Sequence, residues 1–102
     1  MRFSNRLDLP PRVQTICKDI VAAARERGIA DGCNPSSIIG GAIYFACLLL
    51  GVPEAIKEIA AQGVSEVTIR RMYRLYYTDR RKLVKGEWVK EEKVYMDRLP
   101  AP

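Results

Sequence analysis

Histidine is absent from this chain of 102 residues, and its three cysteines, Cys17, Cys33 and Cys47, form no closely spaced pair. A structural zinc site needs four Cys or His ligands at short spacings, so no metal site is expected. An odd number of well-separated cysteines also gives no disulfide framework. Cys17 and Cys47 stand among apolar neighbours, and we predict that both are small core residues of a reduced, intracellular protein.

Long apolar runs are also missing. The longest, Ala42–Leu50, is far below the roughly 20 residues that a membrane-spanning helix requires. The N-terminus does not place an apolar segment after a charged one, as a secretion signal would. We therefore expect a soluble protein with no attachment to a membrane.

Groups that could carry catalysis are scarce. No Ser or Cys stands beside a general base, as nucleophilic catalysis would require. The acids along the chain show no paired arrangement suited to acid–base chemistry, and we interpret them as solvated surface: Asp19, Glu26, Glu54, Glu58 and Glu66. The sequence predicts neither catalytic residues nor a cofactor.

The residues that are present have the composition of an ordinary globular domain, 48% hydrophobic and 28% charged. No stretch alternates apolar and polar residues as a strand does, whereas apolar residues recur every three to four positions. One such stretch begins at Pro10-Pro11 and ends near Gly28, and we expect one more short helix from Arg80 to Val84. The predicted fold class is all-α.

The segment Ser36–Leu50 is apolar nearly all round and follows Asn34-Pro35, a capping side chain and a proline at the first helical position. A helix without a polar stripe is surrounded by other helices. Glycine inside a helix costs about 1 kcal/mol relative to alanine, so Gly40 and Gly41 need a packing reason. We predict a central helix that its neighbours approach closely at these glycines.

Positive charge is concentrated in one stretch. Residues Val67–Gly86 contain seven basic residues and one acid, a net charge of +6, so the remaining residues carry −1 of the total of +5. The basic residues are Arg70, Arg71, Arg74, Arg80, Arg81, Lys82 and Lys85, and the acid is Asp79. A basic excess confined to one stretch favours a phosphate-binding face. A solvated helix face is the alternative.

The helices on either side of Gly63-Val64, together about residues 54–77, predict a helix-turn-helix with Ser65 as the N-cap of its second helix. On that second helix one set of residues recurs at helical spacing and should face the core: Ile69, Met72, Tyr73 and Tyr76. Another set at the same spacing should face outward: Val67, Arg70, Arg71 and Arg74. Such an outward stripe suits a helix lying in the major groove of DNA.

Each outward residue suits a particular DNA contact. Val67 could touch a thymine methyl group, and the planar fork of Arg70 matches guanine O6 and N7, a pairing worth roughly 1–3 kcal/mol of discrimination. Arg71 and Arg74 suit backbone phosphates, which position the protein without specifying sequence. Ser65 and the helix N-terminus offer further N–H donors to a phosphate. Arginine-rich helices that merely face solvent are the alternative.

Several motifs resemble the second cyclin-type repeat of the transcription initiation factor IIB family. These are Arg2-Phe3-Ser4-Asn5, Leu7-Asp8-Leu9-Pro10 and Val13-Gln14 at its entry, Ala42-Ile43-Tyr44-Phe45-Ala46 in its central helix, and Gly63-Val64-Ser65-Glu66-Val67-Thr68-Ile69-Arg70 with Tyr73-Arg74-Leu75-Tyr76 in its recognition helix. The tail Asp97-Arg98-Leu99-Pro100 is similar to the eukaryotic form of the family.

The resemblance implies a cyclin-like five-helix domain over residues 1–85 and a C-terminal extension over residues 86–102. It implies binding to promoter DNA beside a TATA box, together with TATA-binding protein and the RNA polymerase II pre-initiation complex. In the family, the positions of Val67 and Arg70 contact bases and that of Arg74 contacts DNA. A monomer is expected, in the nucleus or, in an archaeon, in the cytoplasm.

Two departures from the family pattern stand out. The interval between Ile59 and Gly63 is one residue shorter than usual, which would rotate the first helix of the motif by about 100°. The family's zinc ribbon, polymerase-facing linker and first repeat have no counterpart, so we expect a fragment or a degenerate paralogue. The alternative function is a cyclin-like interaction module whose basic face docks acidic activators or polymerase subunits.

Overall fold

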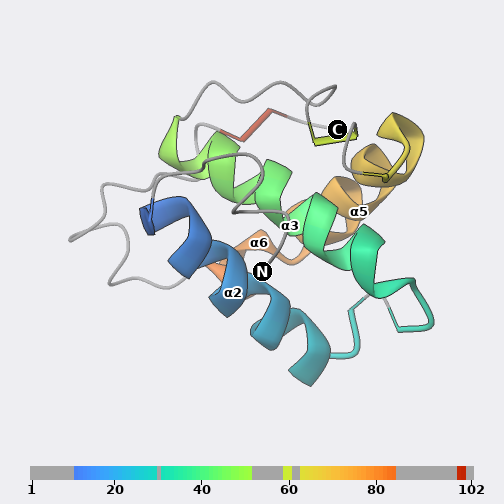
Figure 1. Ribbon diagram of the computed structural model, residues 1–102. Coiled ribbons are helices and arrows are strands. Elements are labelled where there is room, and N and C mark those ends of the chain that lie inside the picture. The colour runs from blue at the N-terminus through green and yellow to red at the C-terminus, as the bar shows by residue number, and fades with distance from the viewer. Residues whose placement is uncertain (1–10, 30, 52–58, 61–62, 85–98, 101–102) are drawn as a thin grey trace.

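The computed structural model describes residues 11–29, 31–51, 59–60, 63–84 and 99–100. The helices with assigned bounds are α2 (Pro11–Glu26), α3 (Pro35–Leu50), α5 (Glu66–Thr78) and α6 (Arg80–Leu83). All regular structure in these residues is helical, so the predicted all-α class is confirmed. Helix α3 lies between α2 and α5 and packs against both (Figure 1).

Helix α2 is amphipathic, as its sequence predicts. Pro11 occupies its first position, where a missing N–H costs little. The helix ends two residues before Gly28, which has a left-handed φ of 71°. Its core-facing residues are buried, as expected from their spacing: Val13, Ile16, Cys17, Ile20, Val21 and Ala24. The opposite side of α2, which carries Lys18 and Arg25, is exposed.

Helix α3 is the predicted centre of the fold. The side chain of Asn34 accepts a hydrogen bond from the Ser36 N–H at 2.9 Å, Pro35 follows, and Gly51 ends the helix at a φ of 70°. The middle of α3 is buried on the sides that face both α2 and α5. A capped helix with almost no polar stripe is therefore held between two amphipathic ones, which supply its apolar surroundings.

The approach of α5 to α3 explains Gly41. A Cβ atom at this position would collide with the Cβ of Met72 and lie 3.2 Å from Cε2 of Tyr76. At Gly40 the nearest atoms, on Val64 and Ile69, would lie at 3.6–3.7 Å, which is ordinary contact. The predicted packing reason is thus confirmed at Gly41, where the glycine lets the two helix backbones come close.

Tyr76 ties the same two helices together by a polar contact. Its ring is fully buried and lies edge-on to Phe45, with centroids 6.0 Å apart. Its hydroxyl donates a hydrogen bond of 2.8 Å to the carbonyl oxygen of Ile38 on α3. Burial raises the pKa of this hydroxyl, so it remains a neutral donor.

Replacing Tyr76 with phenylalanine should lower the free energy of unfolding by about 0.5–1.5 kcal/mol, because the Ile38 carbonyl loses a buried donor. Chemical denaturation of the wild type and the variant measures the difference. Tyr44→Phe is the control, because no hydroxyl bond from Tyr44 to another described residue is lost and its free energy should stay close to that of the wild type. Equal stability of the Tyr76 variant and the wild type would show that the hydrogen bond adds nothing.

Some expectations fall outside the described residues. The first helix of the predicted helix-turn-helix is described only at Ile59 and Ala60, which are helical. The shortened interval before Gly63 and most of residues 86–102, including Trp88 and Tyr95, also lie outside them. The short helix predicted at Arg80–Val84 is confirmed as α6. Within the described chain, no helix has the length and apolarity to span a membrane.

Candidate nucleic-acid interface

Helix α5 begins at a well-formed cap. Ser65 has extended backbone dihedrals, and its Oγ accepts a hydrogen bond from the Thr68 N–H at 3.2 Å. The same hydroxyl donates to Oγ1 of Thr68 at 2.8 Å. Glu66 lies in the first turn, where an acid is favoured by the helix dipole. Ser65 is the predicted N-cap and is exposed, but its hydroxyl proton is already donated to the side chain of Thr68.

The inner face of α5 is the predicted one. Ile69, Met72 and Tyr76 are completely buried and Tyr73 almost so. The ring of Tyr73 packs edge-on to Tyr44 at 5.3 Å and lies 6.0 Å from Phe45. These contacts fix the rotation of α5 about its own axis, and thereby decide which residues face away from the fold.

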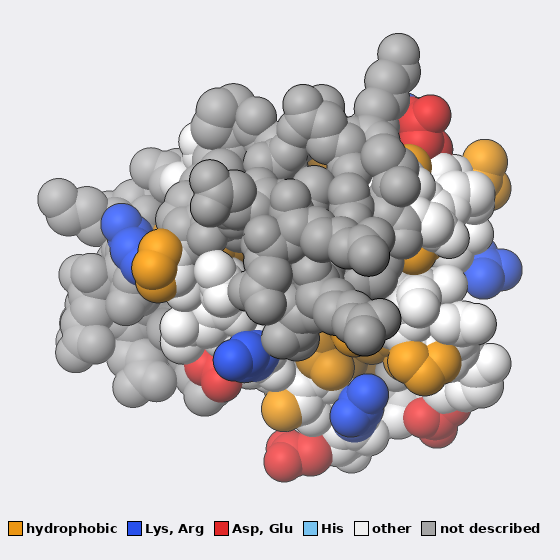
Figure 2. Space-filling view, viewed as in Figure 1, with side chains coloured by type: hydrophobic (Ala, Val, Ile, Leu, Met, Phe, Trp, Pro, Cys, Tyr) orange, Lys and Arg blue, Asp and Glu red, His pale blue; other side chains and the backbone are white. Residues whose placement is uncertain are grey.

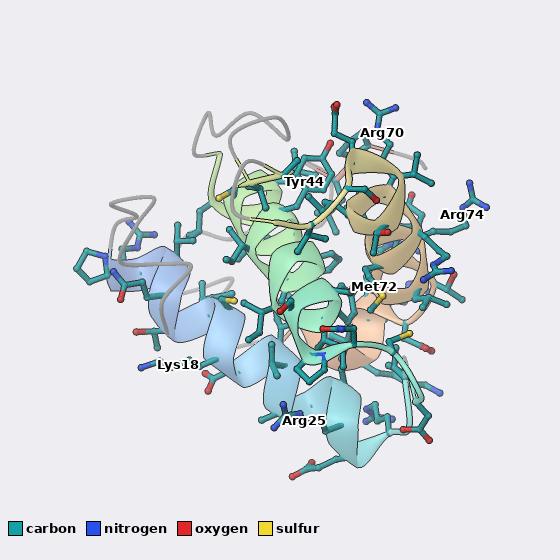
Figure 3. All side chains as sticks on the ribbon, turned by 45° about the vertical axis from the view of Figure 1, so that its right-hand side comes forward. Lys18, Arg25, Tyr44, Arg70, Met72 and Arg74 are labelled. Atoms are coloured by element: carbon teal, nitrogen blue, oxygen red, sulfur yellow. The ribbon has the colours of Figure 1, made fainter. Side chains whose placement is uncertain are left out.

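The four residues predicted to face outward lie together on the opposite side of α5. Val67 is 78% exposed, an unusual state for a large aliphatic side chain. Arg70, Arg71 and Arg74 are exposed as well, and Figure 3 shows Arg70 and Arg74 extending from the helix away from the other helices. No ion pair with another described residue occupies these three guanidinium groups. Within the described part of the chain, nothing competes with an external anion for them.

The other basic residues of the stretch Val67–Gly86 differ in their exposure and contacts. Arg80 is half-buried, with its guanidinium carbon 4.0 Å above the ring of Tyr77. Its Nη1 donates a hydrogen bond of 2.8 Å to the Tyr77 carbonyl oxygen. Arg81 and Lys82 are exposed on α6, and Lys85 lies outside the described residues. From the sequence, Arg80 was predicted only as part of the basic stretch, although Tyr77, three positions earlier, was the signal for this contact.

Two residues near the C-terminus reach α5. Leu99 is buried in the core, and the carbonyl oxygen of Pro100 accepts a 2.5 Å hydrogen bond from the Tyr73 hydroxyl. This contact was not predicted from the sequence, because the two residues are 27 positions apart and no spacing rule joins them. The described end of the C-terminal extension therefore packs against the predicted recognition helix.

The cysteines inside the fold are packed as core residues. Burial, and secondarily the nearby Cys47, raise the pKa of the Cys17 thiol to about 12. Cys17 and Cys47 are buried, as predicted, and Cys33 is half-buried. In the described part of the chain, no three His, Cys, Asp or Glu side chains gather where a metal ion could bind.

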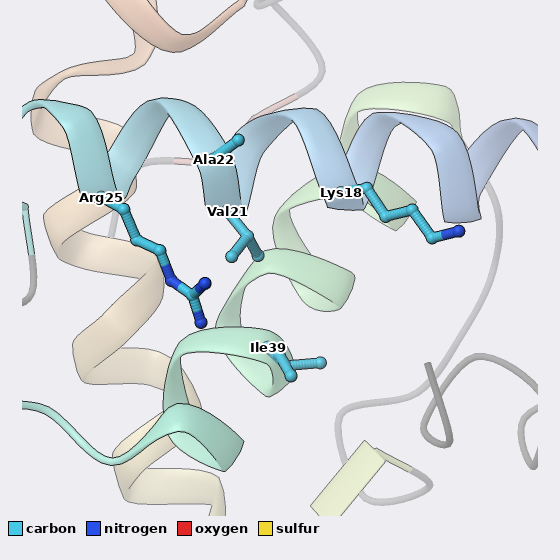
Figure 4. Close-up of a pocket in the computed structure, with 5 residues that line it drawn as sticks. All are labelled: Lys18, Val21, Ala22, Arg25 and Ile39. Atoms are coloured by element: carbon cyan, nitrogen blue, oxygen red, sulfur yellow. The ribbon is translucent and has the colours of Figure 1, made fainter.

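A shallow groove of about 240 Å³ lies between α2 and α3. Its apolar floor is formed by Val21, Ala22 and Ile39, while Lys18 and Arg25 extend along it from α2 (Figure 4). On the face of Figure 2, basic and acidic side chains are interspersed over the α2 side of the molecule. The groove therefore differs from the outward face of α5, where the charged groups are all basic from Arg70 to Arg74.

Comparison with known proteins identifies the family. A sequence model described as "Transcription factor TFIIB repeat" matches residues 1–79. The chain belongs to the transcription factor IIB family. The all-helical structure agrees with a cyclin-like repeat of that family, as the motifs predicted. This is a family of transcription factors rather than of enzymes.

Individual relatives carry the same name. Transcription initiation factor IIB of Schizosaccharomyces pombe is 38% identical over 104 residues, covering 100% of this chain and 31% of the relative. Transcription initiation factor IIB 2 of Thermoplasma acidophilum is 45% identical over 74 residues, 72% of this chain and 24% of the relative. The factor IIB of Methanocaldococcus jannaschii is 39% identical over 74 residues, 72% of this chain and 11% of the relative.

The chain thus spans less than a third of the length of these factor IIB relatives. The match to the yeast factor extends over the whole chain, whereas those to the two archaeal factors cover 72% of it. The eukaryotic character of the tail stays a prediction. The assignment to the second of the family's repeats remains a prediction.

Proposed function

We propose that this chain is the promoter-binding repeat of a transcription initiation factor, and that α5 enters the major groove of DNA beside a TATA box. It would act together with TATA-binding protein and help to recruit RNA polymerase II. The observation that carries the proposal is the division of α5 into a buried aromatic and aliphatic face and an exposed face of Val67, Arg70, Arg71 and Arg74. The setting is the nucleus, or the cytoplasm of an archaeon.

The chemistry of this exposed face fits DNA. An exposed valine near the start of the helix gains from an apolar partner such as a thymine methyl group. Arg70 stands one turn further on, with the reach to hydrogen-bond a guanine edge. Arg71 and Arg74 follow on the same side and supply positive charge for phosphates. In a groove, a helix N-terminus adds backbone N–H donors and a positive dipole end.

Binding to a duplex with a GC-rich segment upstream of a TATA box tests the proposal, with TATA-binding protein present. Fluorescence anisotropy at several salt concentrations gives the affinity and its salt dependence. Each phosphate contact contributes about −0.9 to the slope of log K against log salt. Arg74→Ala should therefore weaken binding to all sequences alike and reduce the magnitude of the slope by about 1.

Arg27→Ala is the matched control, since it removes the same charge from an exposed position after α2. It should leave both affinity and slope close to those of the wild type. Equal effects of Arg27→Ala and Arg74→Ala would mean that only net charge matters. A wild-type affinity that does not change with salt would contradict the proposed interface.

A second candidate function is docking of an acidic activator or a polymerase subunit by the basic face of α5. The observation that favours it is the exposure of Arg70, Arg71 and Arg74, because clustered positive charge attracts an acidic protein segment as well as a phosphate. Arg71→Glu should abolish binding of an acidic partner and leave DNA binding intact if this function is the right one. Loss of DNA binding in the same variant would favour the promoter-binding repeat.

A further inference from the structure

Arg80 is held in a fixed orientation at the end of α5. The cation lies 4.0 Å over the Tyr77 ring, and one N–H of Nη1 donates to the Tyr77 carbonyl oxygen at 2.8 Å. Stacking on an aromatic face and a hydrogen bond together restrict a side chain that is otherwise among the most mobile. The guanidinium carries five N–H donors, and this carbonyl uses one of them.

The position of Tyr77 on α5 relates Arg80 to the outward face. Tyr77 follows Arg70 by seven residues and Arg74 by three, spacings that place all three on one side of a helix. Arg70 and Arg74 extend from that side in Figure 3. The Tyr77 ring also lies 5.9 Å from the ring of the core-facing Tyr73, so the guanidinium of Arg80 that covers it lies at the edge of the outward face, next to the C-terminal end of α5.

The structural role of Arg80 accounts for only part of these contacts. Its bond to the Tyr77 carbonyl satisfies one of the last carbonyls of α5, and a cation is favoured at a helix C-terminus. That role needs a single N–H, and among the described residues no other acceptor takes a hydrogen bond from this guanidinium. Arg80 is partly exposed, so it is not shut off from an anion in solvent.

We propose that Arg80, held over Tyr77, is a preorganised contact to a DNA phosphate and extends the interface beyond Arg74. The inference rests on the proposed promoter-binding function, and it adds a residue that lies outside the outward stripe. A cation already fixed by stacking loses little further freedom when it binds a phosphate, so its contact is stronger than that of a mobile surface arginine.

The test uses the whole chain with TATA-binding protein and the same promoter duplex. Arg80→Gln should weaken binding about three- to tenfold at moderate salt and reduce the magnitude of the salt slope by about 1. Tyr77→Leu keeps the charge but removes the stacking surface, so it should weaken binding with little change in slope. Tyr77→Phe retains an aromatic face and should bind like the wild type. Arg81→Gln, which removes a charge from the exposed neighbouring position, is the matched control and should have a smaller effect on both quantities.

Several results would overturn this assignment. If Arg80→Gln lowers the melting temperature but leaves the salt slope unchanged, Arg80 only caps the helix and does not contact a phosphate. Equal effects of Arg80→Gln and Arg81→Gln would show that net charge alone counts. If Arg74→Ala changes binding as expected and Arg80→Gln does not, this inference fails and the proposed function stands. If neither variant changes binding, both fail together.

Discussion

Replacing Arg70 with alanine should lower the affinity for the preferred promoter sequence about 5- to 150-fold and remove the preference for guanine at one base position. The range corresponds to the roughly 1–3 kcal/mol of discrimination that a bidentate arginine–guanine pair supplies. The exposed position of Arg70, one turn after the exposed Val67, is the basis of this expectation. Competition binding with a duplex series that varies each base pair in turn measures both effects.

Arg71→Ala separates base contact from charge. It removes the same charge from the adjacent exposed position, and as a phosphate contact it should weaken binding to every duplex by a similar factor. The order of preference among the duplexes should then be unchanged. An Arg70→Ala variant that keeps the preference of the wild type would remove Arg70 from the base-contacting residues, whatever its effect on total affinity.

Replacing Gly41 with alanine should lower the free energy of unfolding by about 1–3 kcal/mol, the usual cost of inserting atoms into a packed interior. The new Cβ would collide with the Cβ of Met72 and press against Tyr76. Neither contact is with the far end of a flexible side chain, because one atom is a Cβ and the other belongs to a buried ring. Helices α3 and α5 would therefore have to move apart. Thermal or urea unfolding followed by circular dichroism measures the loss.

Gly40→Ala makes the same chemical change one residue earlier in α3. Its Cβ would find neighbours at ordinary contact distance, and alanine is the better helix former by about 1 kcal/mol. This variant should be as stable as the wild type or more stable. Equal behaviour of the two variants would mean that α5 does not approach α3 closely at Gly41.

The sequence was sufficient to predict the central helix and the two faces of α5. Asn34-Pro35 is a local signal, because the cap and the proline act within one turn of each other. The inward set on α5, including Met72 and Tyr76, follows from helical spacing alone. Gly41 was predicted to have a packing reason, but the residues that it approaches depend on how α5 crosses α3.

Two kinds of contact could not be predicted in this way: those between residues far apart in the sequence, and those of a side chain that has several possible partners. The bond from Tyr73 to the carbonyl of Pro100 spans 27 positions, and its geometry depends on where the chain returns after α6. The sequence alone allows the Arg80 side chain to contact solvent, an acid or an aromatic ring. Only the three-dimensional arrangement shows that it stacks on Tyr77. Local patterns thus define helices and their faces, whereas packing decides which polar side chains remain available for binding.

A chemical-shift map of the whole chain titrated with promoter DNA tests the central claim most directly, because every residue reports separately. We predict that the largest chemical-shift changes occur at the backbone amides from Ser65 to Arg74 and at the guanidinium groups of Arg70 and Arg74. Val13 and Ile20, on the buried side of α2, should not shift. Changes centred on Lys18 and Arg25 in the groove between α2 and α3, with α5 unaffected, would contradict it.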